Sequence, residues 1–282
     1  MREVTWTLHG RQFTGIEWGE AVGTPTVFLH GFLDQAGSWR DVVTDLAGWR
    51  VAIDQRGHGR SAHVEPGAGY HFADYLVDLD ALARLIGPMH LVGHSMGGTV
   101  ATMFAGTRPE LVQSLVLVDG IGLQDSTNEA VERMEHFLND HASPPKNKVF
   151  SGLDAAIIRL RSANPHLSDE YATFLAGRLT NPVEGGLTWS WDARHRMRGA
   201  IPYRHDNHAQ FLRRIKCPVL SIRPEFTPFD QENIRLLEHY LPQLQRAAIP
   251  GASHMVHLEK PAAVAAHLRE FYTLITAVDT NS

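Results

Sequence analysis

A serine flanked by small residues is the strongest chemical signal in the sequence. Gly93-His94-Ser95-Met96-Gly97 matches the pattern G-x-S-x-G, with the apolar run Met89–Val92 before it and the helical pattern Thr99–Ala105 after it. In that context the serine occupies a sharp strand-to-helix turn, which leaves its Oγ exposed above the helix N-terminus. Such a turn needs small residues two positions before and after the serine, which Gly93 and Gly97 provide. The spacing therefore predicts that Ser95 is a nucleophile.

Three further segments resemble motifs of a single superfamily. They are His30-Gly31-Phe32, the loop Asp54-Gln55-Arg56-Gly57-His58-Gly59-Arg60-Ser61, and Gly251-Ala252-Ser253-His254 followed by Glu259 and Pro261. Together with the serine motif they make the chain similar to the α/β-hydrolase superfamily over nearly its whole length. The order of serine, then acid, then histidine along the chain agrees with that resemblance.

The resemblance implies a role for each of these residues. Ser95 would attack the substrate, and His254 would be the general base that takes the serine proton and later returns it to the leaving group. The backbone N–H groups of Phe32 and Met96 would form the oxyanion hole, in which each donor is typically worth about 3 kcal/mol of transition-state stabilisation. The same resemblance implies neither a cofactor nor a metal ion.

The acid is where the sequence departs from the superfamily. Most members carry Asp after the seventh strand, but Thr227 occupies that place here, and threonine cannot carry the negative charge that stabilises the imidazolium. Asp119, at the end of the predicted strand Ser114–Val118, is the preferred candidate, because some members place the acid after the sixth strand. Glu225, Asp230 and a site without an acid remain alternatives.

Alternation of strand-like and helical patterns predicts an α/β fold whose parallel strands are joined by helices. The segment Tyr75–Ile86, for example, repeats apolar residues at intervals of three and four, which indicates an amphipathic helix. We expect about eight mostly parallel strands flanked by helices, the first two forming a hairpin. The predicted strands are Glu3–Leu8, Gln12–Trp18, Thr26–Leu29, Arg50–Ile53, Met89–Val92, Ser114–Val118, Val219–Ile222 and Leu244–Ile249.

The strand pattern lapses between Gly122 and about Asp206, which predicts a helical cap inserted after the sixth strand. We expect helices there at Glu129–Asn139, Leu153–Ser162 and Asp169–Leu179, the last with Ser168 as N-cap, and turns that include Asn181-Pro182. The predicted domains are a core in two parts, residues 1–121 and 207–282, and a cap, residues 122–206.

The region from Gly186 to Ile222 is similar to the junction between cap and core in the serine hydrolase-like branch of the superfamily. If residues 122–206 form a cap, large apolar side chains are candidates for the face over the site. These candidates are Met134, Phe137, Phe174, Trp189 and Trp191.

Composition limits the partners and the compartment. Hydrophobic residues make up 43% and charged residues 20% of the 282 residues, and the net charge is −5 without a block of Lys and Arg. This excludes a nucleic-acid binder and a binder of anionic membranes. A single cysteine, Cys217, excludes an intrachain disulfide and a multi-cysteine metal site. His205 and His208 form at best a weak metal pair, because no third ligand lies nearby in sequence.

Apolar runs of strand size and an N-terminus without a signal-peptide pattern lead us to expect a cytoplasmic protein that acts on a small molecule. A homodimer is compatible with this expectation. The expected activity is hydrolysis of a carboxylic ester, or a related thioester or lactone, of a small to medium apolar substrate through an acyl-enzyme. A carbon–carbon bond hydrolase is one alternative. Others are a cofactor-free ring-cleaving dioxygenase, which shares the fold and a His/Asp pair, and a binding protein without activity.

Overall fold

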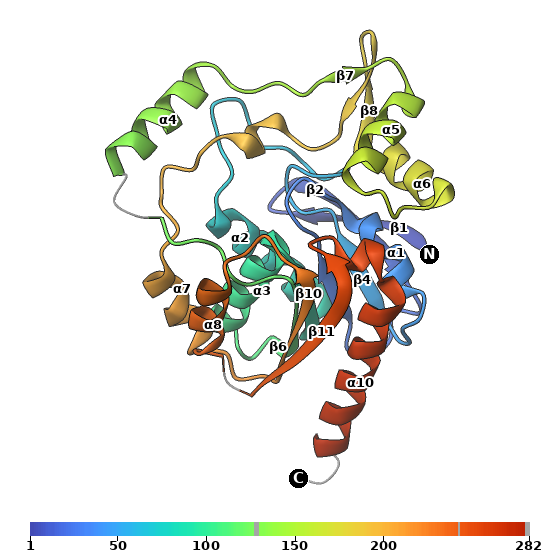
Figure 1. Ribbon diagram of the computed structural model, residues 1–282, viewed down its shortest axis with the longest axis vertical. Coiled ribbons are helices and arrows are strands. Elements are labelled where there is room, and N and C mark those ends of the chain that lie inside the picture. Colours follow the sequence, from blue (N-terminus) through green and yellow to red (C-terminus); the bar gives the residue numbers. More distant parts are fainter. Residues whose placement is uncertain (127–129, 242, 280–282) are drawn as a thin grey trace.

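Figure 1 shows a central sheet with helices on both of its faces in the computed structural model, which describes residues 1–126, 130–241 and 243–279. The eight strands lie in the order β1-β2-β4-β3-β5-β6-β10-β11. β1 and β2 form the predicted hairpin, β2 pairs antiparallel with β4, and all the other neighbours are parallel. This confirms the predicted α/β-hydrolase fold. The strands are β1 (Arg2–Leu8), β2 (Arg11–Trp18), β3 (Thr26–Leu29), β4 (Arg50–Ile53), β5 (Met89–His94), β6 (Val112–Val118), β10 (Val219–Phe226) and β11 (Leu244–Ser253).

The sheet is apolar on both faces, and successive residues of its strands contribute to two separate cores. In β3, Val27 and Leu29 belong to one core while Phe28 belongs to the other, as the period of two requires. The helices on the first face are α2 (Phe72–Ile86), α3 (Met96–Thr107), α7 (His205–Leu212) and α8 (Gln231–Glu238). Those on the second are the 3₁₀ turn η1 (Ala36–Trp39), α1 (Arg40–Val43), α9 (Val256–Glu259) and α10 (Pro261–Asp279).

No helix in the described part of the chain combines the length and the apolar character that crossing a membrane requires.

Residues 122–204, called the inserted segment below, connect β6 to α7 and lie above the sheet in the view of Figure 1. Ser168 caps α6, its side chain accepting from the N–H of Tyr171, as the sequence predicts. The elements of the segment are α4 (Ala130–Ala142), β7 (Val149–Phe150), α5 (Leu153–Ala163), α6 (Asp169–Leu179), β8 (Thr180–Val183), β9 (Gly186–Trp189) and the 3₁₀ turn η2 (Ala193–Arg196). Glu129, the predicted start of the first helix, lies outside the described residues.

The three helices predicted for this segment are present as α4, α5 and α6, but its three strands were not predicted. β7, β9 and β8 form a three-stranded antiparallel sheet in that order. The predicted turn at Asn181-Pro182 lies inside β8, and the chain reverses at Glu184 and Gly185 instead. β8 is an edge strand, where a proline without an N–H can be accommodated. A proline therefore does not exclude this strand, although it hides the strand from a reading of the sequence.

The inserted segment contacts the core through α6. An apolar cluster joins Tyr171 and Leu175 of α6 to Leu258 of α9, and Leu33 and Met255 pack against it. Leu33 follows the segment His30-Gly31-Phe32, and Met255 follows His254. The segment is thus packed against two of the loops that carry predicted site residues.

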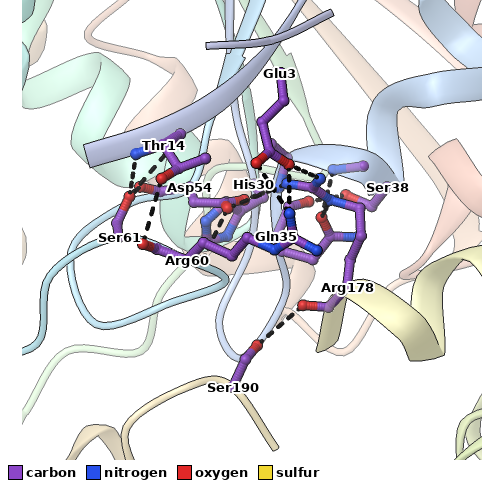
Figure 2. Close-up of polar contacts among 12 residues, drawn as sticks. Glu3, Thr14, His30, Gln35, Ser38, Asp54, Arg60, Ser61, Arg178 and Ser190 are labelled. Atoms are coloured by element: carbon purple, nitrogen blue, oxygen red, sulfur yellow. Dashed lines mark hydrogen bonds and ion pairs between the residues drawn. The ribbon is translucent and has the colours of Figure 1, made fainter. Parts of the chain in front are cut away.

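A buried polar network holds the same helix to the core, and Figure 2 shows its residues. Arg178 of α6 donates to Glu3 at 2.8 Å, to Gln35 at 2.9 Å and to Asp54 at 3.3 Å. The Asp54 side chain is completely buried and that of Arg178 is 10% exposed. Burial raises the pKa of Asp54, and the Arg178 guanidinium opposes that rise. The positive charge of Arg178 therefore compensates the negative charge of the buried Asp54 carboxylate.

Arg178→Met is expected to destabilise the protein by about 3 kcal/mol, because it leaves the buried Asp54 without its cation. Arg161→Met is the matched control, since Arg161 pairs with Asp169 on the surface of the same segment, with both side chains exposed, and it should cost less than about 1 kcal/mol. Chemical denaturation measures both free energies of unfolding. Equal effects would show that the network in Figure 2 does not stabilise the fold.

Candidate active site

Ser95 occupies a strained turn between β5 and α3. Its backbone has φ 51° and ψ −118°, a conformation that non-glycine residues rarely adopt. Its carbonyl accepts from the N–H of Gly98 at 2.9 Å and of Thr99 at 3.2 Å, so helix α3 begins immediately after the serine. This is the geometry that a nucleophile in a strand-to-helix turn requires.

Glycines make this turn possible because backbone atoms of neighbouring segments occupy the positions that a Cβ would take. A Cβ at Gly93 would lie 2.4 Å from the carbonyl oxygen of Gly97, and one at Gly97 would lie 2.4 Å from that of Leu29. Behind the turn, a Cβ at Gly98 would lie 2.4 Å from both the Cα and the carbonyl oxygen of Gly120. Helix α3 therefore packs against the ends of β3 and β6 at distances that only glycine allows.

Gly98→Ala is expected to destabilise the protein by about 3 kcal/mol, because the new methyl group would overlap backbone atoms that have no rotamer to change. Gly177→Ala is the matched control, also inside a helix but with open space around its Cβ position, and it should stabilise by about 0.5 kcal/mol or more. Denaturation curves of the two variants give the comparison. A Gly98→Ala protein as stable as wild type would contradict the close approach.

His254 connects the serine to a carboxylate. It follows β11, and its Nε2 lies 3.0 Å from Ser95 Oγ while its Nδ1 lies 2.6 Å from Asp119 Oδ2. A carboxylate only accepts, so Nδ1–H donates to Asp119 and Nε2 accepts the proton of the Ser95 hydroxyl. Asp119 follows β6 and is 3% exposed. The structure thus brings the three predicted residues together in one hydrogen-bonded chain.

The other two candidate acids have different partners. Glu225 accepts from the N–H of Gly251 at 2.8 Å. Asp230 caps α8, accepting from the N–H groups of Glu232 and Asn233 in its first turn. Among the described residues, neither carboxylate forms a hydrogen bond with the ring of His254, which leaves Asp119 as the carboxylate in that place.

Thr227, at the position where the superfamily usually has its acid, supports Asp119 instead. Its Oγ1 lies 2.9 and 3.0 Å from the two carboxylate oxygens of Asp119. The hydroxyl can donate, so it stabilises the charged carboxylate and fixes its orientation toward His254. The sequence marks Thr227 only as a missing acid, and nothing in the residue type signals this supporting contact.

Thr227→Val should lower hydrolytic turnover about tenfold, the effect of losing one hydrogen bond to a charged group, while the shape of the side chain is kept. Thr227→Ser keeps the hydroxyl and should stay close to wild type. Steady-state kinetics on an ester substrate give the comparison. If both variants lost activity equally, the hydroxyl would not be the feature that matters.

The two backbone N–H groups predicted to form an oxyanion hole belong to residues close to Ser95. Met96 is the first residue of α3, and Phe32 follows Gly31, at which a Cβ would lie 3.3 Å from Ser95 Cβ. Within the described residues, neither the N–H of Phe32 nor that of Met96 donates to another group of the chain. The N-terminus of α3 adds a favourable dipole for an anion at this point.

The loop from Asp54 to Ser61 holds the Phe32 loop in place. His58 Nε2 accepts from the N–H of Leu33 at 3.2 Å, and His30 Nε2 accepts from the N–H of Gln55 at 3.0 Å. Both rings are buried, and burial lowers the pKa of each, so they are neutral acceptors. This loop, quoted above only for its family likeness, thereby positions the predicted oxyanion donor.

His94 makes a contact that the sequence analysis missed. Its Nε2 donates to the carbonyl oxygen of His254 at 2.9 Å, which connects the loop of His254 to the end of β5, directly before Ser95. The ring is 1% exposed, and burial lowers its pKa well below the usual value. In the sequence His94 is merely the variable residue of G-x-S-x-G, so no signal distinguishes it.

The remaining candidates have structural partners. His205 Nε2 contacts the carbonyl oxygen of Leu123 at 2.7 Å, and His208 Nε2 contacts Thr102 Oγ1 at 2.7 Å, so the two rings are not arranged as a metal pair.

Of the apolar candidates in the inserted segment, three join the cluster around α6, while two lie on α4, which has no buried residue. The former are Phe174, Trp189 and Trp191, and the latter are Met134 and Phe137.

Comparisons with known proteins agree with this fold. Residues 26–267 match the model of the alpha/beta hydrolase family. The chain is 32% identical to a serine hydrolase-like protein of Danio rerio, covering 92% of this chain and 85% of that one. It is 27% identical to the 2-(acetamidomethylene)succinate hydrolase of Mesorhizobium japonicum, covering 85% and 84%. A solved thioesterase domain from the curacin biosynthetic pathway is 31% identical, with a TM-score of 0.85 and coverage of 94% and 98%.

Proposed function

Because the chain belongs to the α/β-hydrolase family, in its serine hydrolase-like branch, we propose that this hydrolase cleaves a carboxylic ester, or the related thioester, through an acyl-enzyme on Ser95. The observation that carries the proposal is the hydrogen-bonded chain from Ser95 through His254 to Asp119, with distances of 3.0 and 2.6 Å. These are the distances that a nucleophile, its base and an orienting carboxylate need.

The first half of the reaction forms the acyl-enzyme. Ser95 Oγ attacks the carbonyl carbon of the substrate while His254 Nε2 takes its proton, and Asp119 stabilises the imidazolium. The negative charge that develops on the carbonyl oxygen is met by the N–H groups of Phe32 and Met96. His254 then gives its proton to the leaving oxygen or sulfur, and the bond to the leaving group breaks.

The second half releases the acid. A water molecule gives its proton to His254 Nε2 and attacks the acyl carbon, again through a tetrahedral oxyanion. Collapse of this intermediate breaks the bond to Ser95 Oγ, which takes the proton back from His254. In sum, one ester or thioester and one water are consumed, and one carboxylic acid and one alcohol or thiol are released, so no redox partner is required.

We assign the predicted cap, residues 122–206, the task of limiting access to this site. Support comes from the packing of α6 against Leu33 and Met255, each of which adjoins a proposed catalytic group. Apolar side chains also border the site, since Phe229 lies edge-on to the His254 ring at 5.4 Å and Phe32 is 49% exposed. These surroundings favour an acyl group of small to medium size and apolar character.

A panel of matched substrates tests the proposal. Each acyl chain is offered as an oxygen ester and as a thioester, and a fluorophosphonate probe reports whether Ser95 is reactive. We expect labelling at Ser95 by peptide mass spectrometry and turnover of at least one series, with a burst of leaving group in the first turnover. A protein that is folded, unlabelled and inactive on both series would contradict the acyl-enzyme.

Oxygen uptake on a hydroxyquinolone is the control for the ring-cleaving alternative. That chemistry needs His254 as a base for a ring hydroxyl rather than Ser95 as a nucleophile. The Ser95–His254 hydrogen bond favours the hydrolase, for which we expect no oxygen consumption.

A further inference from the structure

Three buried side chains that the proposed reaction does not use converge behind Ser95. Asp34 comes from the loop after β3, His94 from the end of β5, and His257 from α9. One ligand atom from each lies within 4.8 Å of the others. The three residues are 6%, 1% and 0% exposed, so the cluster is enclosed by the core.

Polar atoms of this cluster lack hydrogen-bond partners within the described part of the chain. They are Asp34 Oδ2, His94 Nδ1 and both ring nitrogens of His257. His257 Nε2 and Asp34 Oδ2 lie 3.5 Å apart without forming a hydrogen bond. Native proteins leave few buried polar atoms unsatisfied, and a group of them in one place points to a bound water or ion.

The orientation of His94 selects the kind of group that fits. Its Nε2–H donates to the carbonyl oxygen of His254 at 2.9 Å, so in the neutral ring the lone pair is on Nδ1, which has no hydrogen-bond partner in the described part of the chain. A histidine that binds a metal through one nitrogen commonly donates from the other to a backbone carbonyl in this way. His94 is therefore already in the tautomer that metal binding requires.

Charge distinguishes an ion from a water. Among the residues that the structure describes, Asp34 forms no ion pair with a Lys or Arg. The one basic side chain within 4.0 Å of its carboxylate is that of the buried His257. A buried carboxylate that lacks a positively charged partner is unfavourable, because burial removes the water that would otherwise stabilise its negative charge. A divalent cation would supply that charge, whereas a water molecule would not.

We propose that Asp34, His94 and His257 form a binding site for a divalent transition-metal ion such as Zn²⁺. Two imidazoles and one carboxylate are a ligand set that suits Zn²⁺, which favours four ligands and leaves one position here for water. The site is separate from the Ser95 hydroxyl and the ring of His254, so it does not depend on the proposed hydrolase reaction. It adjoins that reaction through His94, which donates to the His254 carbonyl and whose ring centroid lies 4.8 Å from that of His254.

Loading with Co²⁺ and Zn²⁺ tests the site. Protein stripped with a chelator is refolded in the presence of each metal, so that burial does not prevent entry, and the metal content is measured after gel filtration. We expect about one equivalent per chain, with visible absorption bands of Co²⁺ in a low-symmetry nitrogen and oxygen site. Wild-type protein that retains no metal after this treatment would overturn the proposal.

Variants locate the ion. His257→Gln should weaken binding by about 100-fold or more, while His205→Gln, at a buried histidine outside the cluster, should bind like wild type. His254→Ala should also keep the metal, which separates this cluster from binding at the proposed base. Loss of metal in His254→Ala but not in His257→Gln would place the ion at the catalytic residues and refute the assignment.

A crystal of the wild-type protein grown with Co²⁺ decides the matter even if His257→Gln does not fold. We expect an anomalous difference peak between Asp34 Oδ2, His94 Nδ1 and a ring nitrogen of His257. A peak elsewhere, or a water at this point, would show that the cluster does not bind metal.

Discussion

Replacing Ser95 with alanine is expected to lower ester or thioester hydrolysis by on the order of 10⁶-fold, because no other group can form the acyl-enzyme. The remaining activity would come from binding and from the oxyanion donors, which the substitution leaves in place. Initial rates on the best substrate of the panel, together with fluorophosphonate labelling, measure the effect.

Ser114→Ala is the matched control for Ser95→Ala. Ser114 is completely buried in β6, and its hydroxyl contacts His90 rather than His254, so its removal should leave labelling and turnover close to wild type. Retention of more than about 1% of wild-type activity by pure Ser95→Ala protein would be far above this expectation and would exclude Ser95 as the nucleophile.

Asp119→Asn carries the second large effect, a fall in turnover of about 10⁴-fold. The amide keeps the shape of the side chain, but it cannot stabilise the imidazolium and it favours the wrong tautomer of His254. Glu225→Gln and Asp230→Asn should each change the rate by less than about tenfold, because these carboxylates bind backbone N–H groups instead. A crippled Glu225→Gln with a nearly normal Asp119→Asn would place the acid after β10.

A rescue variant sharpens this result. Thr227 Oγ1 lies 2.9 Å from the Asp119 carboxylate, so Asp119→Asn combined with Thr227→Asp brings a carboxylate close to His254 from the usual side. Partial recovery of the rate would show that the ends of β6 and β10 can both serve the histidine. No recovery would show that only the end of β6 has the required geometry.

The main sheet could be predicted because its strands are buried on both faces and bounded by turn residues. Each predicted strand is present, although β10 continues to Phe226 and β11 to Ser253, where the chain becomes more polar. The small sheet of the inserted segment was missed because β7 has only two residues and β8 contains Pro182. This sheet forms through hydrogen bonds between segments whose sequences show little strand pattern on their own.

The positions of the site residues could be predicted because each one follows a strand of the parallel sheet, and such strands end at one edge. The supporting contacts could not. Thr227 and Asp119 are separated by 108 residues, and His94 and His254 by 160, so only the folded chain shows which side chains meet. Residue type identifies a group that can donate a hydrogen bond, but not the group that receives it.

The placement of the acid after β6 also divides the chain unequally. Phe32, Ser95 and Asp119 all precede the inserted segment, and His254 alone comes after it. A backbone cut within that segment would therefore yield one fragment with the proposed nucleophile, carboxylate and oxyanion donors, and a second with only the proposed base. Since β10 pairs with β6 and α7 packs against α3, catalysis by such a split enzyme would report directly on the reassembly of its two fragments.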